Sequence, residues 1–174
     1  MSEGPGDPAE RRDWEGSLRD VITSGSAPVH LVGVGNSLRT DDAVGLEIIS
    51  ALRSRLGAAP TRGLRVHPIS AMPERLLSRL ASKPGLIVVF DAVESSQGAG
   101  TVVFTRLSDT KYGFFATHNV PLQLIPGIRS RGDGVFILGV QPESLEVGEG
   151  LTGKVSASAR RIADVVAEAA EGRA

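Results

Sequence analysis

The chain has 174 residues, a length that accommodates one compact domain rather than two. Hydrophobic residues make up 41% of it and charged residues 22%, a composition typical of a globular protein that argues against extensive disorder. The 19 Lys and Arg residues nearly balance the 20 Asp and Glu residues, so general electrostatic binding to nucleic acid is not expected.

The absence of long apolar segments and of cysteine excludes several classes of protein. No apolar stretch approaches the length of a membrane helix, and Arg11-Arg12 precede no apolar run of a secretion signal, so we expect a cytoplasmic protein with no membrane partner. The chain has no cysteine, which excludes disulfides, thiolate zinc sites, iron–sulfur clusters and cysteine nucleophiles. Any metal would be held by carboxylates and by imidazoles from the three histidines, which are His30, His67 and His118.

The elements are expected to alternate between strand and helix. Residues 1–28, with scattered Gly, Pro and acidic residues, are expected to form a flexible N-terminal extension with a short helix near 14–22. Apolar runs predict strands at 29–34, 64–69, 86–90, 101–105 and 135–140, and helical periodicity predicts helices at 44–56, 73–80 and 155–170. This order predicts a single α/β domain of three layers, with a mainly parallel twisted sheet and helices on both faces.

Acidic residues follow two of the predicted strands. Asp41 and Asp42 lie after the first strand, and Asp91 directly follows the most apolar one. Ligands of such sheets bind beyond the carboxyl ends of the strands, and a carboxylate beside a buried run is costly unless a cation or several donors compensate it. These aspartates are therefore candidate site residues. A turn or helix cap explains Asp91 about equally well, and one of Asp41 and Asp42 is expected to be an N-cap.

The histidines differ in their surroundings. His118 is expected at a helix N-terminus, where the helix dipole keeps the imidazole neutral and able to bind a metal. A lone histidine is more often structural, and this is the expected role of His30 and His67 within strands. The spacing from Asp42 to Asp91 and on to His118 matches no local metal motif, so folding would have to assemble a joint site.

Other motifs carry less weight. The segment 33–38 is similar to the start of a dinucleotide fingerprint, but Leu38 occupies the third glycine position and would crowd the pyrophosphate turn. The segment 148–154 is similar to a phosphate loop, yet Val155 replaces the hydroxyl residue that would hold magnesium. The chain contains neither a Gly-x-Ser-x-Gly elbow nor a His-Glu-x-x-His helix. A nucleotide-binding enzyme remains a less favoured alternative, and serine-hydrolase and standard zinc-protease interpretations lose their main support.

Several segments form an ordered set along the chain. They are Gly33-Val34-Gly35-Asn36-Ser37-Leu38-Arg39-Thr40-Asp41-Asp42-Ala43-Val44-Gly45, Phe90-Asp91-Ala92, the Thr117-His118 region, Leu138-Gly139-Val140-Gln141-Pro142-Glu143-Ser144-Leu145 and Gly150-Leu151-Thr152. Together they resemble the [NiFe]-hydrogenase maturation endopeptidases. The resemblance covers roughly residues 29 to 170 in the same order, and it is the ordered set that makes it specific.

The resemblance implies a phosphorylase/hydrolase-like fold in a protease domain spanning residues 29–174. It also implies a cytoplasmic endopeptidase that removes a short C-terminal extension from a [NiFe]-hydrogenase large-subunit precursor after nickel insertion. The precursor carries the nickel, which serves as the recognition signal. By motif position, Asp42, Asp91 and His118 would contact this nickel and carry the catalysis, and another divalent metal is expected to substitute in vitro.

The resemblance leaves the chemistry of cleavage open. The metal could polarise the scissile carbonyl or activate a water while a carboxylate moves protons, which is the route we favour. Alternatively, the three residues could chiefly dock the precursor and align its bond. Asp41 would be a neighbour that supports the ligands or a cap. A non-catalytic nickel-checking chaperone of hydrogenase assembly could use the same residues.

Two positions depart from the family pattern. Some members carry Glu where this chain has Asp42, a change in length that keeps the ligand type. The segment Ser70-Ala71-Met72-Pro73-Glu74 lacks the Gly-Gly-Thr of some relatives and is similar to the variant with Pro-Glu. Selection of the substrate tail is therefore expected to differ from that of the Gly-Gly-Thr members.

Overall fold

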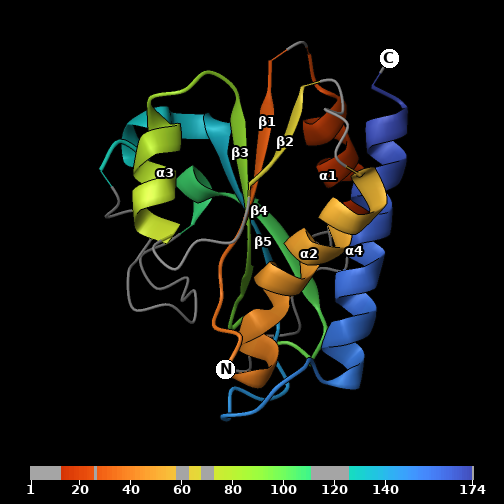
Figure 1. Cartoon of the computed structure of the whole chain (residues 1–174). Helices are drawn as coiled ribbons and strands as arrows, with labels where there is room; N and C mark the ends of the chain where they lie inside the picture. Colours follow the sequence, from red (N-terminus) through yellow and green to blue (C-terminus); the bar gives the residue numbers. More distant parts are fainter. Residues whose placement is uncertain (1–12, 26, 58–62, 68–72, 111–125, 174) are drawn as a thin grey trace, which may run out of the picture.

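Strands and helices alternate along the chain (Figure 1). The computed structural model describes residues 13–25, 27–57, 63–67, 73–110 and 126–173. The helices are α1 (Trp14–Thr23), α2 (Val44–Leu56), α3 (Pro73–Ala81) and α4 (Gly153–Glu171), the strands are β1 (Val29–Gly33), β2 (Leu64–Val66), β3 (Leu86–Ala92), β4 (Val102–Arg106) and β5 (Val135–Val140), and the short 3-10 helices are η2 (Thr40–Ala43), η3 (Leu107–Asp109) and η5 (Arg129–Gly134). Within these residues, no helix combines the length and the apolar character needed to cross a membrane.

The strands form one sheet in the order β2-β1-β3-β5-β4. All neighbouring pairs are parallel except β4 and β5, which pair antiparallel at one edge. Every residue of β1 and β5 is buried, as is every residue of β3 after Leu86, because helices cover both faces of the sheet. The predicted single α/β domain with a mainly parallel sheet is confirmed.

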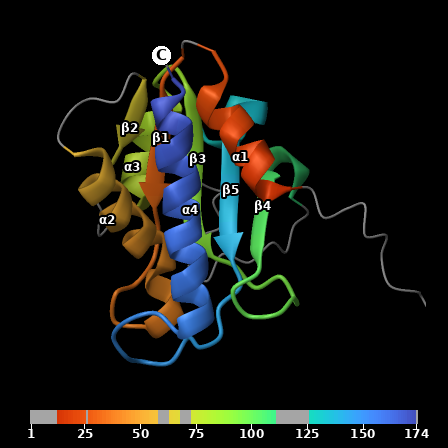
Figure 2. The same ribbon diagram turned by 90° about the vertical axis from the view of Figure 1, so that its right-hand side faces the viewer.

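The helices make the two outer layers. Helices α1, α2 and α4 lie on one face, and α3 lies on the other (Figures 1 and 2). Side chains of β3 alternate between two apolar clusters: Val88 and Phe90 join the first with α2 and α4, and Ile87 and Val89 join the second with α3. This alternation follows from the two-residue period of a strand.

The connections that leave β1 and β3 run in opposite directions along the sheet. Helix α2 leads from β1 to β2 on one side, and the chain returns through α3 to β3 on the other side of β1. This reversal is the switch point at which α/β sheets bind ligands, beyond the carboxyl ends of the strands. The arrowheads of β1 and β5 point to the same end in Figure 2, where the loop from β5 to α4 lies beside the segment joining β1 to α2.

Helix α1 corrects part of the predicted N-terminal extension. The short helix expected near 14–22 is present, and its Leu18 and Ile22 are fully buried in the core shared with α4. Residues 1–12 lie outside the described residues. The described part of the extension therefore belongs to the domain, because its two apolar side chains lie on one face of a helix that packs against α4.

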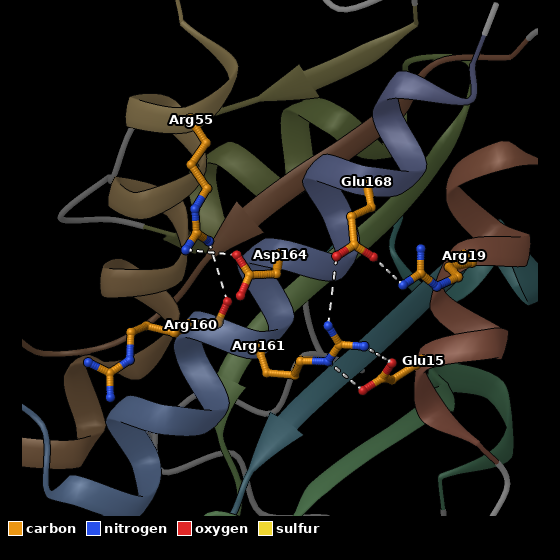
Figure 3. Close-up of polar contacts among 7 residues, drawn as sticks. All are labelled: Glu15, Arg19, Arg55, Arg160, Arg161, Asp164 and Glu168. Carbon is orange, nitrogen blue, oxygen red and sulfur yellow. Dashed lines mark hydrogen bonds and ion pairs between the residues drawn. The ribbon is translucent and has the colours of Figure 1, made fainter.

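Ion pairs connect the outer surfaces of these helices (Figure 3). The Arg161 guanidinium on α4 donates two hydrogen bonds to the Glu15 carboxylate on α1, the first at 2.8 Å, and lowers its pKa. Arg55 on α2 pairs with Asp164 at 2.9 Å. Each such exposed pair contributes only about 0–1 kcal/mol, so the buried side chains dominate the packing.

Four strands differ from their predicted bounds: β1 ends one residue earlier than predicted, β4 is shifted by one residue, and β2 and β3 differ more. Strand β3 continues through Asp91 to Ala92, so this aspartate lies inside the strand rather than after it. Its pairing with β5 continues to Ala92 opposite Val140, and this supplies the main-chain hydrogen bonds that extend the strand. Strand β2 ends at Val66, and part of the predicted strand 64–69 lies outside the described residues.

Candidate functional site

The loop that follows β1 packs main chain against main chain on the end of β3. A Cβ at Gly45 would lie 2.2 Å from the carbonyl oxygen of Phe90 and 2.3 Å from that of Val34. A Cβ at Gly35 would lie 2.2 Å from the carbonyl oxygen of Asp42. Only glycine fits at these positions, and η2 thereby contacts β3. The space beside these glycines is filled by the protein's own backbone, which disfavours the nucleotide-binding interpretation.

Asp42 lies in η2 at this contact. Asp42 is only 4% exposed to solvent. Its N–H donates to the Arg39 carbonyl at 2.8 Å, and its own carbonyl accepts from the Asn36 N–H at 3.2 Å. These turn hydrogen bonds fix the backbone from which the Asp42 carboxylate extends.

Asp91 lies near the end of β3 and is fully buried. Its Oδ1 accepts a hydrogen bond from the Ala92 N–H at 2.8 Å, and its Cα lies opposite that of Gly139 in β5. The helix-cap alternative for Asp91 is wrong, because the residue lies in a central strand. Since β3 contacts η2, the fold brings Asp42 and Asp91 to the adjoining carboxyl ends of β1 and β3.

Asp41 makes a dense set of hydrogen bonds. Its carboxylate is fully buried and accepts from the N–H groups of Glu143, Ser144 and Thr152 at 2.8, 3.0 and 2.7 Å. It also accepts from the Thr152 hydroxyl at 2.9 Å. Thr152 is the N-cap residue of α4, so the negative charge lies at the favourable end of the helix dipole.

These contacts correct the predicted capping role. Helix α2 has Ala43 at its N-cap, without a side-chain capping hydrogen bond, so neither Asp41 nor Asp42 caps it. Instead, Asp41 fastens the loop after β1 to the loop between β5 and α4. The sequence does not show this role, because all its partners lie more than 100 residues further along the chain.

The same two loops are joined by other hydrogen bonds. Thr40 donates through its N–H to the Gly148 carbonyl at 2.9 Å and through its hydroxyl to the Ser144 carbonyl at 2.7 Å. The Arg39 Nε donates to the Leu145 carbonyl at 3.1 Å. The segment that carries Asp42 is therefore held along its length.

His118 lies outside the described residues, so the structure places two of the three predicted metal contacts. Within the described ranges, no three His, Asp or Glu side chains group closely enough to hold a metal ion. Asp42 and Asp91 supply two carboxylates on neighbouring elements, and a third ligand would have to come from elsewhere.

His30 and His67 form a separate pair near the amino end of β1. The His30 Nδ1 and the His67 Nε2 lie 2.9 Å apart, and the His30 Nε2 lies 3.2 Å from the Pro84 carbonyl oxygen. Since a carbonyl only accepts, His30 donates from Nε2 and accepts at Nδ1 from the His67 N–H. Burial lowers the pKa of both rings, and that of His67 falls to about 4. The pair is a structural contact that the sequence analysis did not foresee.

Comparison with known proteins identifies the family. No family model matches the chain. The hydrogenase 2 maturation protease of Escherichia coli K12 is 30% identical to it over 134 residues, which are 73% of this chain and 80% of that protein. The chain belongs to the hydrogenase maturation proteases.

Solved structures of hydrogenase maturation proteases agree with this family assignment. The crystal structure of the [NiFe] hydrogenase maturation protease HycI from Thermococcus kodakarensis KOD1 superposes with a TM-score of 0.75 and 27% identity, covering 89% of this chain and 99% of that one. The maturating endopeptidase HybD from E. coli gives a TM-score of 0.61 and 26% identity, covering 83% and 93%. The family predicted from the motifs is confirmed, and the chain is a hydrolase of this protease family.

Proposed function

We propose that this hydrogenase maturation protease removes the C-terminal extension of a [NiFe]-hydrogenase large-subunit precursor in the cytoplasm, after nickel has been inserted. Asp42, Asp91 and His118 contact the nickel that the precursor carries. The observation that carries the proposal is the burial of Asp42 and Asp91 at the adjoining carboxyl ends of β1 and β3, in a chain of this family.

The chemistry of these side chains supports recognition of a metal. Two ionised carboxylates on contacting elements of a buried region repel each other, and a divalent cation between them offsets that repulsion. Carboxylate oxygens and a neutral imidazole nitrogen suit nickel and other divalent first-row metals. Three protein ligands leave coordination positions for the ligands of the precursor.

Cleavage follows as hydrolysis of one peptide bond. A water oxygen bonds to the scissile carbonyl carbon, the C–N bond breaks, and a proton from the water reaches the leaving amine. The nickel of the precursor would polarise the carbonyl or activate the water. The carboxylate of Asp42 or Asp91 accepts the proton and returns it to the amine.

Reconstitution from two pure proteins tests the proposal. The protein is mixed with a nickel-loaded or a nickel-free large-subunit precursor, and the precursor mass is followed by mass spectrometry. We expect a shortened product only from the nickel-loaded form. Equal cleavage of both forms would contradict nickel recognition. Binding without any shortened product would instead support the chaperone alternative.

A further inference from the structure

Two large hydrophobic side chains are exposed in the two loops that hydrogen-bond to each other beside η2. Among the described residues, Leu38 is 64% exposed and Val147 is 87% exposed. Leu38 lies in the loop after β1, and Val147 lies in the loop between β5 and α4. Single exposed apolar residues are common on protein surfaces, but these two come together from distant parts of the chain.

Backbone pairing places them side by side. Arg39 and Gly148 form an isolated parallel bridge, and the Gly148 N–H donates to the Leu38 carbonyl at 3.0 Å. Leu38 and Val147 each precede one partner of this bridge. The Gly148 N–H follows Val147 in the chain, so its hydrogen bond to the Leu38 carbonyl places the peptide between Val147 and Gly148 against Leu38. We call the pair of Leu38 and Val147 the apolar lip.

The apolar lip rests on a fixed backbone. The Leu38 N–H donates to the Asn36 side-chain oxygen at 3.0 Å, and the Glu146 N–H donates to the Ser144 hydroxyl at 3.2 Å. The hydrogen bonds of Asp41 also join these two loops. A surface that is already ordered loses little conformational entropy when a partner binds, which favours binding.

Acidic side chains outnumber basic ones near the apolar lip. Glu143, Glu146 and Glu149 are all exposed on the loop that carries Val147. The nearby basic side chains are Arg39, and Lys154 at 3.8 Å from Glu143. An occupant that fits this surface therefore presents an aliphatic side chain flanked by Lys or Arg.

The apolar lip also lies close to the proposed site. The Asp42 N–H donates to the carbonyl of Arg39, the residue after Leu38, at 2.8 Å. A polypeptide seated on the lip is thus held one turn of η2 away from Asp42. Positioning of this kind lowers the barrier to a reaction at the neighbouring bond.

We propose that the apolar lip docks the precursor polypeptide beside its scissile bond, through an aliphatic side chain with basic neighbours. This inference rests on the proposed function, since it names the surface that holds the same substrate. It assigns binding to Leu38 and Val147 and gives them no part in bond cleavage.

Steady-state cleavage of the nickel-loaded precursor tests the proposal. Leu38→Ser and Val147→Ser remove the apolar surface from exposed positions, and Leu38→Met and Val147→Ile retain it as matched controls. We expect each Ser variant to raise KM about five- to tenfold with kcat unchanged, and the controls to keep the KM of the unaltered protein. An unchanged KM in the double Ser variant would overturn the proposal.

A charge series gives a second readout. Glu146→Lys and Glu149→Lys should raise KM at low salt, and the difference should shrink at about 0.5 M salt because surface charges are screened. Glu171→Lys is the control, since the other end of α4 lies about 27 Å away along the helix. An equal effect of Glu171→Lys would show that net charge, rather than the lip, is responsible.

Binding separates this proposal from the proposed function. Affinity for the precursor is measured in an Asp91→Asn background, so that the precursor remains intact. If the unaltered protein does not cleave, the proposed function fails, and weaker binding by the Ser variants still supports the lip. If the unaltered protein cleaves and the Ser variants bind equally well, the docking inference alone fails.

Discussion

Asp41 accepts two hydrogen bonds from Thr152, one from the backbone N–H at 2.7 Å and one from the hydroxyl at 2.9 Å. The pair joins the loop after β1 to the N-cap residue of α4 across 111 positions. Asp42 directly follows Asp41 in the chain. The geometry of the proposed metal contact therefore depends on α4, a helix from the C-terminal part of the chain.

Replacing Asp41 tests this dependence. Asp41→Asn puts an amide NH₂ where one carboxylate oxygen accepts hydrogen bonds, which leaves buried donors facing a donor. We expect the free energy of unfolding to fall by about 2–4 kcal/mol in urea denaturation. Glu149→Gln, an exposed acid of the joined loop, should change it by less than about 0.5 kcal/mol. Equal stability of the Asn variant and the unaltered protein would contradict the inference that Asp41 joins the two loops.

Asp91 is tested by an isosteric change. Because its side chain is fully buried, an alanine would also leave a cavity, so Asp91→Asn is the sharper variant. We expect at least a 100-fold loss in kcat/KM for the nickel-loaded precursor, as for His118→Ala. Circular dichroism should remain that of a folded protein. Cleavage within about threefold of normal would remove Asp91 from the site.

Gly45 allows the close approach of α2 to β3. Alanine normally favours a helix over glycine, but here its Cβ would meet two backbone carbonyl oxygens that cannot move aside. We expect Gly45→Ala to lower the free energy of unfolding by about 1–3 kcal/mol. Gly153→Ala is the matched control, since nothing lies within 4 Å of its Cβ position in the first turn of α4. That variant should be neutral or slightly stabilising.

The lowered pKa of His67 predicts that the stability of the protein depends on pH. Burial, and then the charges of His30, Arg79 and Arg65, lower its pKa from 6.5 to about 4. Between these pH values the unfolded chain binds a proton that the folded protein excludes. The stability that the neutral His67 ring contributes is therefore complete above about pH 6.5 and is lost as the pH falls towards 4, by about 1–2 kcal/mol because solvent screens this half-buried ring. Urea denaturation of His67→Gln should show a shallower loss over this range, and an unchanged slope would refute the assignment.

Helix α1 is held both by buried apolar side chains and by surface ion pairs, and two variants distinguish their contributions. Leu18 is fully buried against α4, whereas Arg161 and Glu15 pair at the surface. We expect Leu18→Ala to cost about 2–5 kcal/mol and Arg161→Gln less than about 1 kcal/mol. Hydrogen exchange of the α1 amides should accelerate strongly only in the first variant. Similar acceleration in both would show that the ion pair holds the helix.

The sequence predicted the central strands better than the details of the site. Strands such as β1 and β5 are apolar on both faces, and that pattern is visible without a structure. The end of β3 was placed too early because a charged residue usually marks a strand terminus, whereas Asp91 is held inside by pairing with β5. Asp41 and Asp42 are adjacent and alike in sequence, and the sequence does not show that Asp41 has distant partners.

The hydrogen bonds of Asp41 also bear on biosynthesis. Their donors lie between Glu143 and Thr152, so a nascent chain on the ribosome gains them only after most of the polypeptide has been made. Until then the loop that carries Asp42 has only its local turn hydrogen bonds. An incomplete translation product therefore lacks the long-range hydrogen bonds that join this loop to the loop before α4.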